Sequence, residues 1–168
     1  TEVKKIAQII PSSNAYTGLD VTESRVKYLS NSGKLKDYSI LHFATHAKSF
    51  PEIPELSSII LTADEADFIP SYVSKNFTQE DGLLRIDEIR DLDIEADMVC
   101  LSACETGVGK LYLTEGVVSF SQAFMEAGAN SVTITLWPIF DKTTSQFMVS
   151  MYEKVADGIY YSTAINKT

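Results

Sequence analysis

Residues 39–45 read SILHFAT and are followed by His46, while residues 97–102 read DMVCLS and lead to Cys104. Both stretches are nearly unbroken apolar runs of strand length. Such runs are typical of strands that are covered on both faces in a parallel α/β sheet. Two predicted buried strands therefore each end at a chemically reactive residue, and together they indicate an α/β fold.

Strand and helix patterns alternate outside these two runs. Asp20 and Glu23 form a D-x-x-E pattern, which predicts a capped amphipathic helix over Val21 to Leu29. Further along we expect a strand at 56–61, a long loop at 62–82, a helix at 116–127 ended by Gly128, a strand at 131–137, and a helix at 143–156. The alternation predicts a mostly parallel sheet flanked by helices.

Composition restricts the class of protein. With 168 residues, of which 45% are hydrophobic and 22% charged, the chain has the size of one domain with a buried core. The formal net charge is -9 and the 14 Lys and Arg residues are spread along the chain, which argues against a nucleic-acid partner. No apolar run is long enough to span a bilayer, so we expect no membrane partner and a cytoplasmic location.

The two cysteines, Cys100 and Cys104, differ in their expected roles. They lie on one extended segment, roughly 13 Å apart at about 3.3 Å per residue, which is too far for a disulfide. Cysteine is among the most buried residue types, so Cys100 is expected to pack in the core. Cys104 differs because the strand pattern stops there.

His46 and Cys104 suggest nucleophilic chemistry. The ligand crevice of an open parallel sheet lies outside the carboxyl ends of its strands, so both residues can face one reacting atom. A thiolate held by an imidazole would attack a carbonyl and form a thioester. The imidazolium would then protonate the leaving group, water would complete hydrolysis, and nearby backbone N–H groups would serve the oxyanion.

The histidines also allow a structural interpretation, because a histidine in an apolar run is more often part of the core than a catalyst. His42 lies on the same strand face as His46, but four residues along a strand is too far for both to bind one metal ion. We interpret His42 as structural and predict no metal site from these two histidines.

Several motifs in order resemble one known family. The runs LHFATHA (41–47), LSACETGVG (101–109), EGVVSFSQAFMEAGANSVTITLWPIFDKTTSQFM (115–148) and MYEKV (151–155) closely resemble the CHAT domain over roughly residues 16–165. This domain is a caspase-like cysteine peptidase module of the caspase-haemoglobinase fold, distantly related to separase and often attached to tetratricopeptide repeats. The resemblance implies that His46 and Cys104 are the catalytic dyad of an endopeptidase that acts on protein substrates without a metal or cofactor.

The resemblance also shows two departures. The histidine motif of the family usually continues with Gly, whereas Ala47 follows His46 here. The backbone N–H groups of Ala47 and Cys104 are the expected oxyanion donors. The methyl group of Ala47 is tolerable at this position unless the backbone there needs a positive φ. Family members usually carry a further segment with its own strand before the first helix. We therefore expect residues 1–168 to be a single CHAT-like domain, a fragment of a larger protein that lacks this N-terminal segment.

The resemblance to caspase-like peptidases implies that substrate preference depends on the loops after the nucleophile strand and the next strand, here residues 105–115 and 137–142. Trp137 and Asp141 would suit a Lys or Arg before the cleaved bond through cation–π contact and charge pairing. The alternatives are that Trp137 fills the core and that Asp141 caps the helix at Thr143. Glu105 is a further candidate for substrate binding, and it could instead order the glycine-containing loop.

Two classes of function follow. The first is a cysteine endopeptidase regulated by a neighbouring tetratricopeptide-repeat region or an activator. The second is a catalytically silent caspase-like module that uses the same fold as an interaction or signalling surface. A third option is acyl transfer to an acceptor other than water, which the same thioester would support.

Overall fold

The computed structural model describes residues 1–50, 52–63, 80–105, 113–135 and 141–168, and only the backbone of residues 104, 105, 113–117, 141 and 142. The chain divides into two compact units. Residues Gly18–Trp137 form the first unit, which carries the sheet, and Thr1–Thr17 with Pro138–Thr168 form the second.

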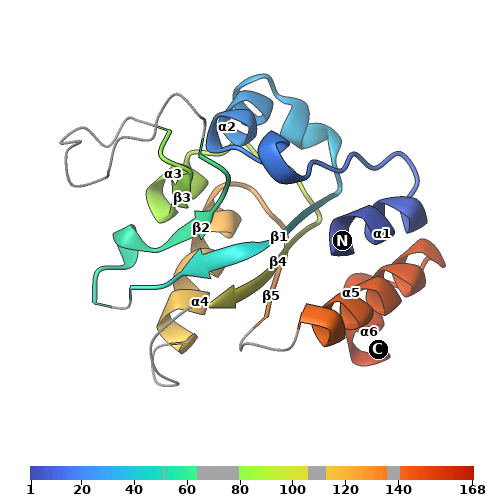
Figure 1. Cartoon of the computed structure of the whole chain (residues 1–168). Helices are drawn as coiled ribbons and strands as arrows, with labels where there is room; N and C mark the ends of the chain where they lie inside the picture. The colour runs from blue at the N-terminus through green and yellow to red at the C-terminus, as the bar shows by residue number, and fades with distance from the viewer. Residues whose placement is uncertain (51, 64–79, 106–112, 136–140) are drawn as a thin grey trace. The chain divides into compact units, whose positions relative to one another are not determined.

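A five-stranded sheet with the order β3-β2-β1-β4-β5 forms the first unit (Figure 1). Its strands are β1 (Ile40–Lys48), β2 (Ser58–Ile60), β3 (Leu83–Arg85), β4 (Met98–Glu105) and β5 (Val132–Ile134). β4 lies between β1 and β5 and runs parallel to both. The strands predicted from residues 39–45, 97–102 and 131–137 are confirmed as this parallel part of the sheet.

Of the remaining two strands, only β2 reverses direction, and β3 again runs in the direction of β1. β2 pairs antiparallel with β1, and β3 pairs antiparallel with β2. The strand expected at 56–61 is therefore present as β2, but it is the strand that runs against the others. The pattern did not predict β3, because a three-residue strand at the end of a long polar stretch has too few alternating positions to be recognised.

Helices and 3₁₀ turns accompany the sheet among the described residues of the first unit. The helices are α2 (Glu23–Asn31), α3 (Ile86–Arg90) and α4 (Leu113–Glu126). The 3₁₀ turns are η1 (Gly18–Asp20), η2 (Lys34–Asp37) and η3 (Pro54–Leu56), the last between β1 and β2. The cap of α2 differs from the expectation. Thr22, not Asp20, is the N-cap, and its hydroxyl accepts the Arg25 N–H at 3.2 Å. Asp20 lies one turn earlier in η1, where it pairs with Arg25 at 3.5 Å.

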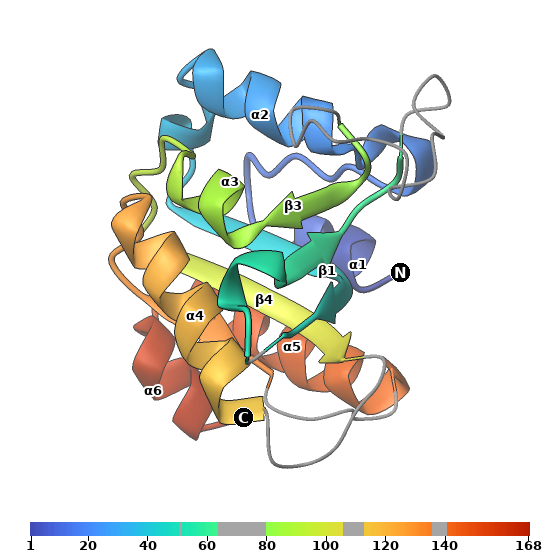
Figure 2. The same cartoon turned by 90° about the vertical axis from the view of Figure 1, so that its left-hand side faces the viewer.

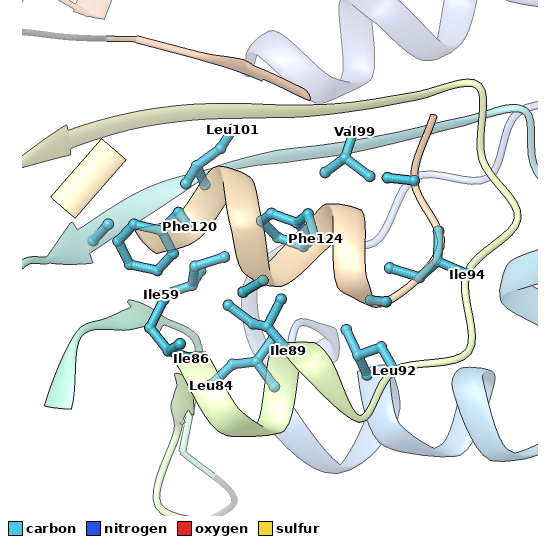
Figure 3. Packing of buried hydrophobic residues seen from close by; sticks show 14 of the residues in the cluster. Ile59, Leu84, Ile86, Ile89, Leu92, Ile94, Val99, Leu101, Phe120 and Phe124 are labelled. Carbon is cyan, nitrogen blue, oxygen red and sulfur yellow. The ribbon is translucent and has the colours of Figure 1, made fainter. Parts of the chain in front are cut away.

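The main core lies on one face of the sheet, between β1, β4, α3 and α4 (Figures 2 and 3). Val99 and Leu101 of β4 are almost fully buried there, together with Phe120 and Phe124 of α4. Phe43 of β1 packs on Phe124 with ring centroids 5.6 Å apart. The apolar residues whose helical spacing predicted α4 thus form the face of this helix that contacts the sheet.

The second unit contains α1 (Glu2–Ile9), α5 (Asp141–Ala156) and α6 (Tyr161–Asn166). Met148, Met151 and Tyr152 of α5 are buried, as their spacing predicted, whereas Phe147 is 37% exposed. Within the described residues, the helices are too short or too polar to cross a membrane.

Candidate active site

His46 and Cys104 occupy paired positions on adjacent parallel strands. The register of β1 on β4 runs without a break from Ile40 with Met98 to Ala47 with Glu105, and it pairs the Cα of His46 with that of Cys104. Neighbouring strands lie about 4.8 Å apart. His46 stands two residues before the end of β1, and Cys104 stands one before the end of β4. The two backbone positions therefore meet at the carboxyl ends of two central strands.

The apolar pattern determines this register. Leu41 and Phe43 of β1 pair with Val99 and Leu101 of β4, and all four pack on the main core. A slip by one residue would move every side chain of a strand to the opposite face and expose this set. Packing of the core therefore excludes a one-residue shift of His46 relative to Cys104.

The other neighbour of His46 is Ile60 of β2, and the Thr45 hydroxyl donates a hydrogen bond to the Ile60 carbonyl. This hydroxyl adds a side-chain contact between β1 and β2 beside His46. His46 itself is exposed, so its imidazole is accessible to solvent and to a ligand.

Ala47 lies inside β1, with Ile59 of β2 on one side and Glu105 of β4 on the other. It is 7% exposed, and its backbone is that of a strand, not of the left-handed region that favours Gly. The methyl group that replaces the usual Gly hydrogen is accommodated without backbone strain. The oxyanion role of Ala47 and Cys104 stays a prediction.

His42 and Cys100 form another register pair further back along β1 and β4. Cys100 has no exposed surface and His42 is half-buried. These positions fit the packing role expected of Cys100 and the structural role expected of His42. In the part of the chain that the structure describes, no group of three or more His, Cys, Asp or Glu side chains is arranged to hold a metal ion.

Of the three expected substrate-binding residues, the structure describes only the backbone of Glu105 and Asp141. Trp137 lies outside the described residues. Glu105 is the last residue of β4, and Asp141 is the first residue of α5. Because α5 begins at Asp141, the backbone of this residue lies in the first helical turn. The substrate pocket stays a prediction.

A buried charge cluster on the β2–β3 side of the sheet was not recognised from the sequence. The Lys27 ammonium lies 2.7 Å from Glu23, 2.8 Å from Glu88 and 3.5 Å from Glu80. Glu23 is 1% exposed, and its second carboxylate oxygen accepts the Gly82 N–H at 3.0 Å. The i,i+4 spacing of Glu23 and Lys27 was the available signal, but such pairs usually lie on a helix surface.

Burial is the main cause that shifts the pKa of Glu23, raising it to about 7; the hydrogen bond from Lys27 opposes this rise and the Glu88 carboxylate adds to it. Burial lowers the pKa of Lys27, but its hydrogen bonds to Glu23 and Glu88 outweigh burial and raise it above the ordinary value. Three carboxylates around one ammonium leave an excess of negative charge, which favours the protonated form of the most buried acid.

The chain matches one family model over its whole length and two known proteins over part of it. The family model of the CHAT domain matches residues 1–168 and so covers both compact units. Tetratricopeptide repeat protein 28 of Homo sapiens is 24% identical over 152 residues, which cover 76% of this chain and 6% of that protein. Its counterpart in Mus musculus is 27% identical over 85 residues, which cover 51% of this chain and 3% of that protein. The chain thus spans a small part of these relatives, and it belongs to the CHAT domain family.

Proposed function

We propose that this chain is a cysteine endopeptidase in which Cys104 is the nucleophile and His46 is the general base. The observation that carries the proposal is the register that pairs the two positions at the carboxyl ends of β1 and β4. Membership of the CHAT domain, a caspase-like family, supports the same chemistry.

The proposed reaction has two steps. The imidazole of His46 takes the proton of the Cys104 thiol, and the thiolate attacks the peptide carbonyl to form a thioester while the leaving amine receives that proton. Water, deprotonated by His46, then attacks the thioester, releases the acid product and restores the thiol. Backbone N–H groups near Ala47 and Cys104 would stabilise the oxyanion in both steps.

We further propose that Trp137, Asp141 and Glu105 favour Lys or Arg before the cleaved bond, through an aromatic surface and negative charge. The Asp141→Ala variant would then lose cleavage after basic residues while other cleavage remains. The cytoplasm, where thiols stay reduced, is the proposed compartment. A tetratricopeptide-repeat region like that named in the relatives is the proposed regulatory neighbour.

The first test is mass spectrometry of a diverse peptide library incubated with the wild-type chain and with Cys104→Ala. We expect cleavages that occur only with the wild type. A second measurement follows alkylation of Cys104 by iodoacetamide at neutral pH, which should slow by about tenfold or more in His46→Ala because the thiolate loses its partner.

The matched control is His42→Ala, which removes a histidine from the same strand and should leave Cys104 labelling unchanged. Absence of cleavage together with a slow, His46-independent thiol would contradict the peptidase. It would favour the catalytically silent interaction module instead.

A further inference from the structure

Three exposed apolar side chains lie in the loop between β1 and β2, of which the structure describes residues 49, 50 and 52–57. Phe50 is 43% exposed, Ile53 is 52% exposed and Leu56 is 39% exposed. Single exposed apolar residues are ordinary, but a cluster often marks an interaction site. We call these three residues the apolar stripe.

Hydrogen bonds hold the apolar stripe together. The Ile53 N–H donates to the Phe50 carbonyl and the Leu56 N–H donates to the Ile53 carbonyl, each at 3.0 Å. Four-residue turns of this kind keep their first and last Cα atoms within about 7 Å of each other. The spacing of three therefore places the apolar residues next to one another along the loop.

The loop is also anchored at its base. The Phe50 N–H donates to the Ser57 hydroxyl at 2.9 Å, and the Ser57 carbonyl accepts the Ile86 N–H at 3.1 Å. Ser57 and Ser58 are each 1% exposed. These hydrogen bonds restrain the backbone at Phe50 and Ser57, which would reduce the ordering free energy that a ligand has to provide.

The loop leaves the sheet at the end that carries the candidate site. Lys48, the last residue of β1, pairs with Ser58 of β2, so the loop closes two residues beyond the pairing of His46 with Ile60. Figure 1 shows the loop extending past the arrowhead of β1, at the end of the sheet where β4 also terminates. A polypeptide that reaches His46 and Cys104 comes to the end of the sheet from which this loop projects.

Two acidic residues accompany the apolar stripe. Glu52 and Glu55 are exposed. Glu52 directly precedes Ile53, and Glu55 directly precedes Leu56. The loop thus presents apolar surface and negative charge together, within a chain whose net charge is -9. An apolar segment that contains Lys or Arg complements both features.

We propose that the apolar stripe, with Glu52 and Glu55, binds the peptide substrate through apolar side chains that lie next to Lys or Arg. This inference rests on the proposed peptidase function and adds a second recognition element on β1–β2 to the predicted pocket at Trp137 and Asp141. Substrates would be basic, apolar segments of proteins, bound first along the loop and then presented to Cys104.

Binding to the inactive Cys104→Ala chain tests the surface without any need for cleavage. The probe is a fluorescent peptide that contains Leu, Phe and Arg, compared with the same peptide carrying Ser and Glu at those places. In the Cys104→Ala background, Ile53→Ser with Leu56→Ser should weaken binding of the first peptide by about tenfold or more, since two apolar contacts are lost. Glu52→Lys with Glu55→Lys should weaken it at low salt and have less effect at high salt.

Leu19→Ser is the matched control because Leu19 is a 75% exposed apolar residue outside the loop. Circular dichroism and the thermal midpoint verify that each variant is folded. Equal binding of the two peptides, or equal weakening by Leu19→Ser, would overturn the proposal.

Library cleavage separates the two proposals. Cleavage that depends on Cys104 but shows the same preferences in the stripe variant would retain the peptidase and reject the apolar stripe. Loop-dependent binding without any cleavage, together with a slow, His46-independent Cys104 thiol, would retain the stripe as a peptide-binding surface and reject the peptidase.

Discussion

Glu23 shows how one buried acid can make stability depend on pH. Its carboxyl accepts hydrogen bonds from Lys27 and the Gly82 N–H and interacts with Glu88. Glu80 also contacts Lys27, and Arg85 interacts electrostatically with Glu23. The folded pKa of about 7 lies above the ordinary value of 4.5. The folded state therefore binds the proton more tightly than the unfolded state does.

The sign of the pH dependence follows from this difference. The stabilisation from Glu23 protonation is complete below pH 4.5 and is lost as the pH rises through about 7. In Glu23→Gln, the amide replaces the protonated carboxyl and can donate to Glu88. We expect the unfolding free energy of this variant to decline less over that range than that of the wild type, by roughly 3 kcal/mol, as measured by urea denaturation at several pH values.

Glu95→Gln is the control for this prediction. Glu95 is 67% exposed and pairs with Lys36 on the surface at 3.2 Å. Its replacement should leave the pH dependence of the wild type unchanged. If Glu23→Gln shows the same decline as the wild type, the titrating group is not Glu23.

At the scale of elements, α4 and α5 end in the same way but in different surroundings. Gly128 N–H donates to the Met125 carbonyl after α4, and Gly158 N–H donates to the Val155 carbonyl after α5. Both glycines have a positive φ, +111° and +83°. A Cβ at Gly128 would lie 1.9 Å from the Ile94 carbonyl oxygen, whereas a Cβ at Gly158 would meet nothing within 4 Å.

We therefore expect Gly128→Ala and Gly158→Ala to differ in cost. Gly158→Ala should lower the unfolding free energy by about 1 kcal/mol, which is the cost of the left-handed backbone alone. Gly128→Ala adds a clash with backbone and should cost about 3 kcal/mol or more. Thermal and urea denaturation of both variants measure the difference, and equal costs would mean that the Ile94 segment moves away without penalty.

At the scale of the whole molecule, the sheet order predicts where the fold is most resistant to opening. β1 and β4 have paired neighbours on both sides, whereas β3 and β5 are the edge strands of the described sheet. Edge strands present a row of unpaired backbone groups, and each of these has only three residues.

Hydrogen exchange followed by mass spectrometry tests this expectation. Amides of β1 and β4 should exchange at the rate of global unfolding, and those of β3 and β5 should exchange earlier by local opening. Protection of β5 equal to that of β4 would indicate that another segment covers the β5 edge.

Local patterns predicted much of the fold. Apolar runs predicted β1 and β4, helical spacing predicted α4 and α5, and the motifs around His46 and Cys104 predicted the family. Short elements were missed because their patterns contain too few residues: β3 and α3 span three and five residues. The cap of α2 was assigned to Asp20 because D-x-x-E is a common capping pattern, whereas the Thr22 hydroxyl caps the helix here.

The sequence by itself determined the strands β1, β2, β4 and β5, that His46 and Cys104 stand near strand ends, and that the chain resembles the CHAT domain. Only the tertiary structure decided that β1 and β4 are neighbours in the register that pairs His46 with Cys104, that β2 runs against the other strands, and that Glu23 is buried. The physical reason is that propensity and periodicity act within a few residues. Strand order, direction and burial depend on packing all apolar faces at once, between residues far apart in the chain.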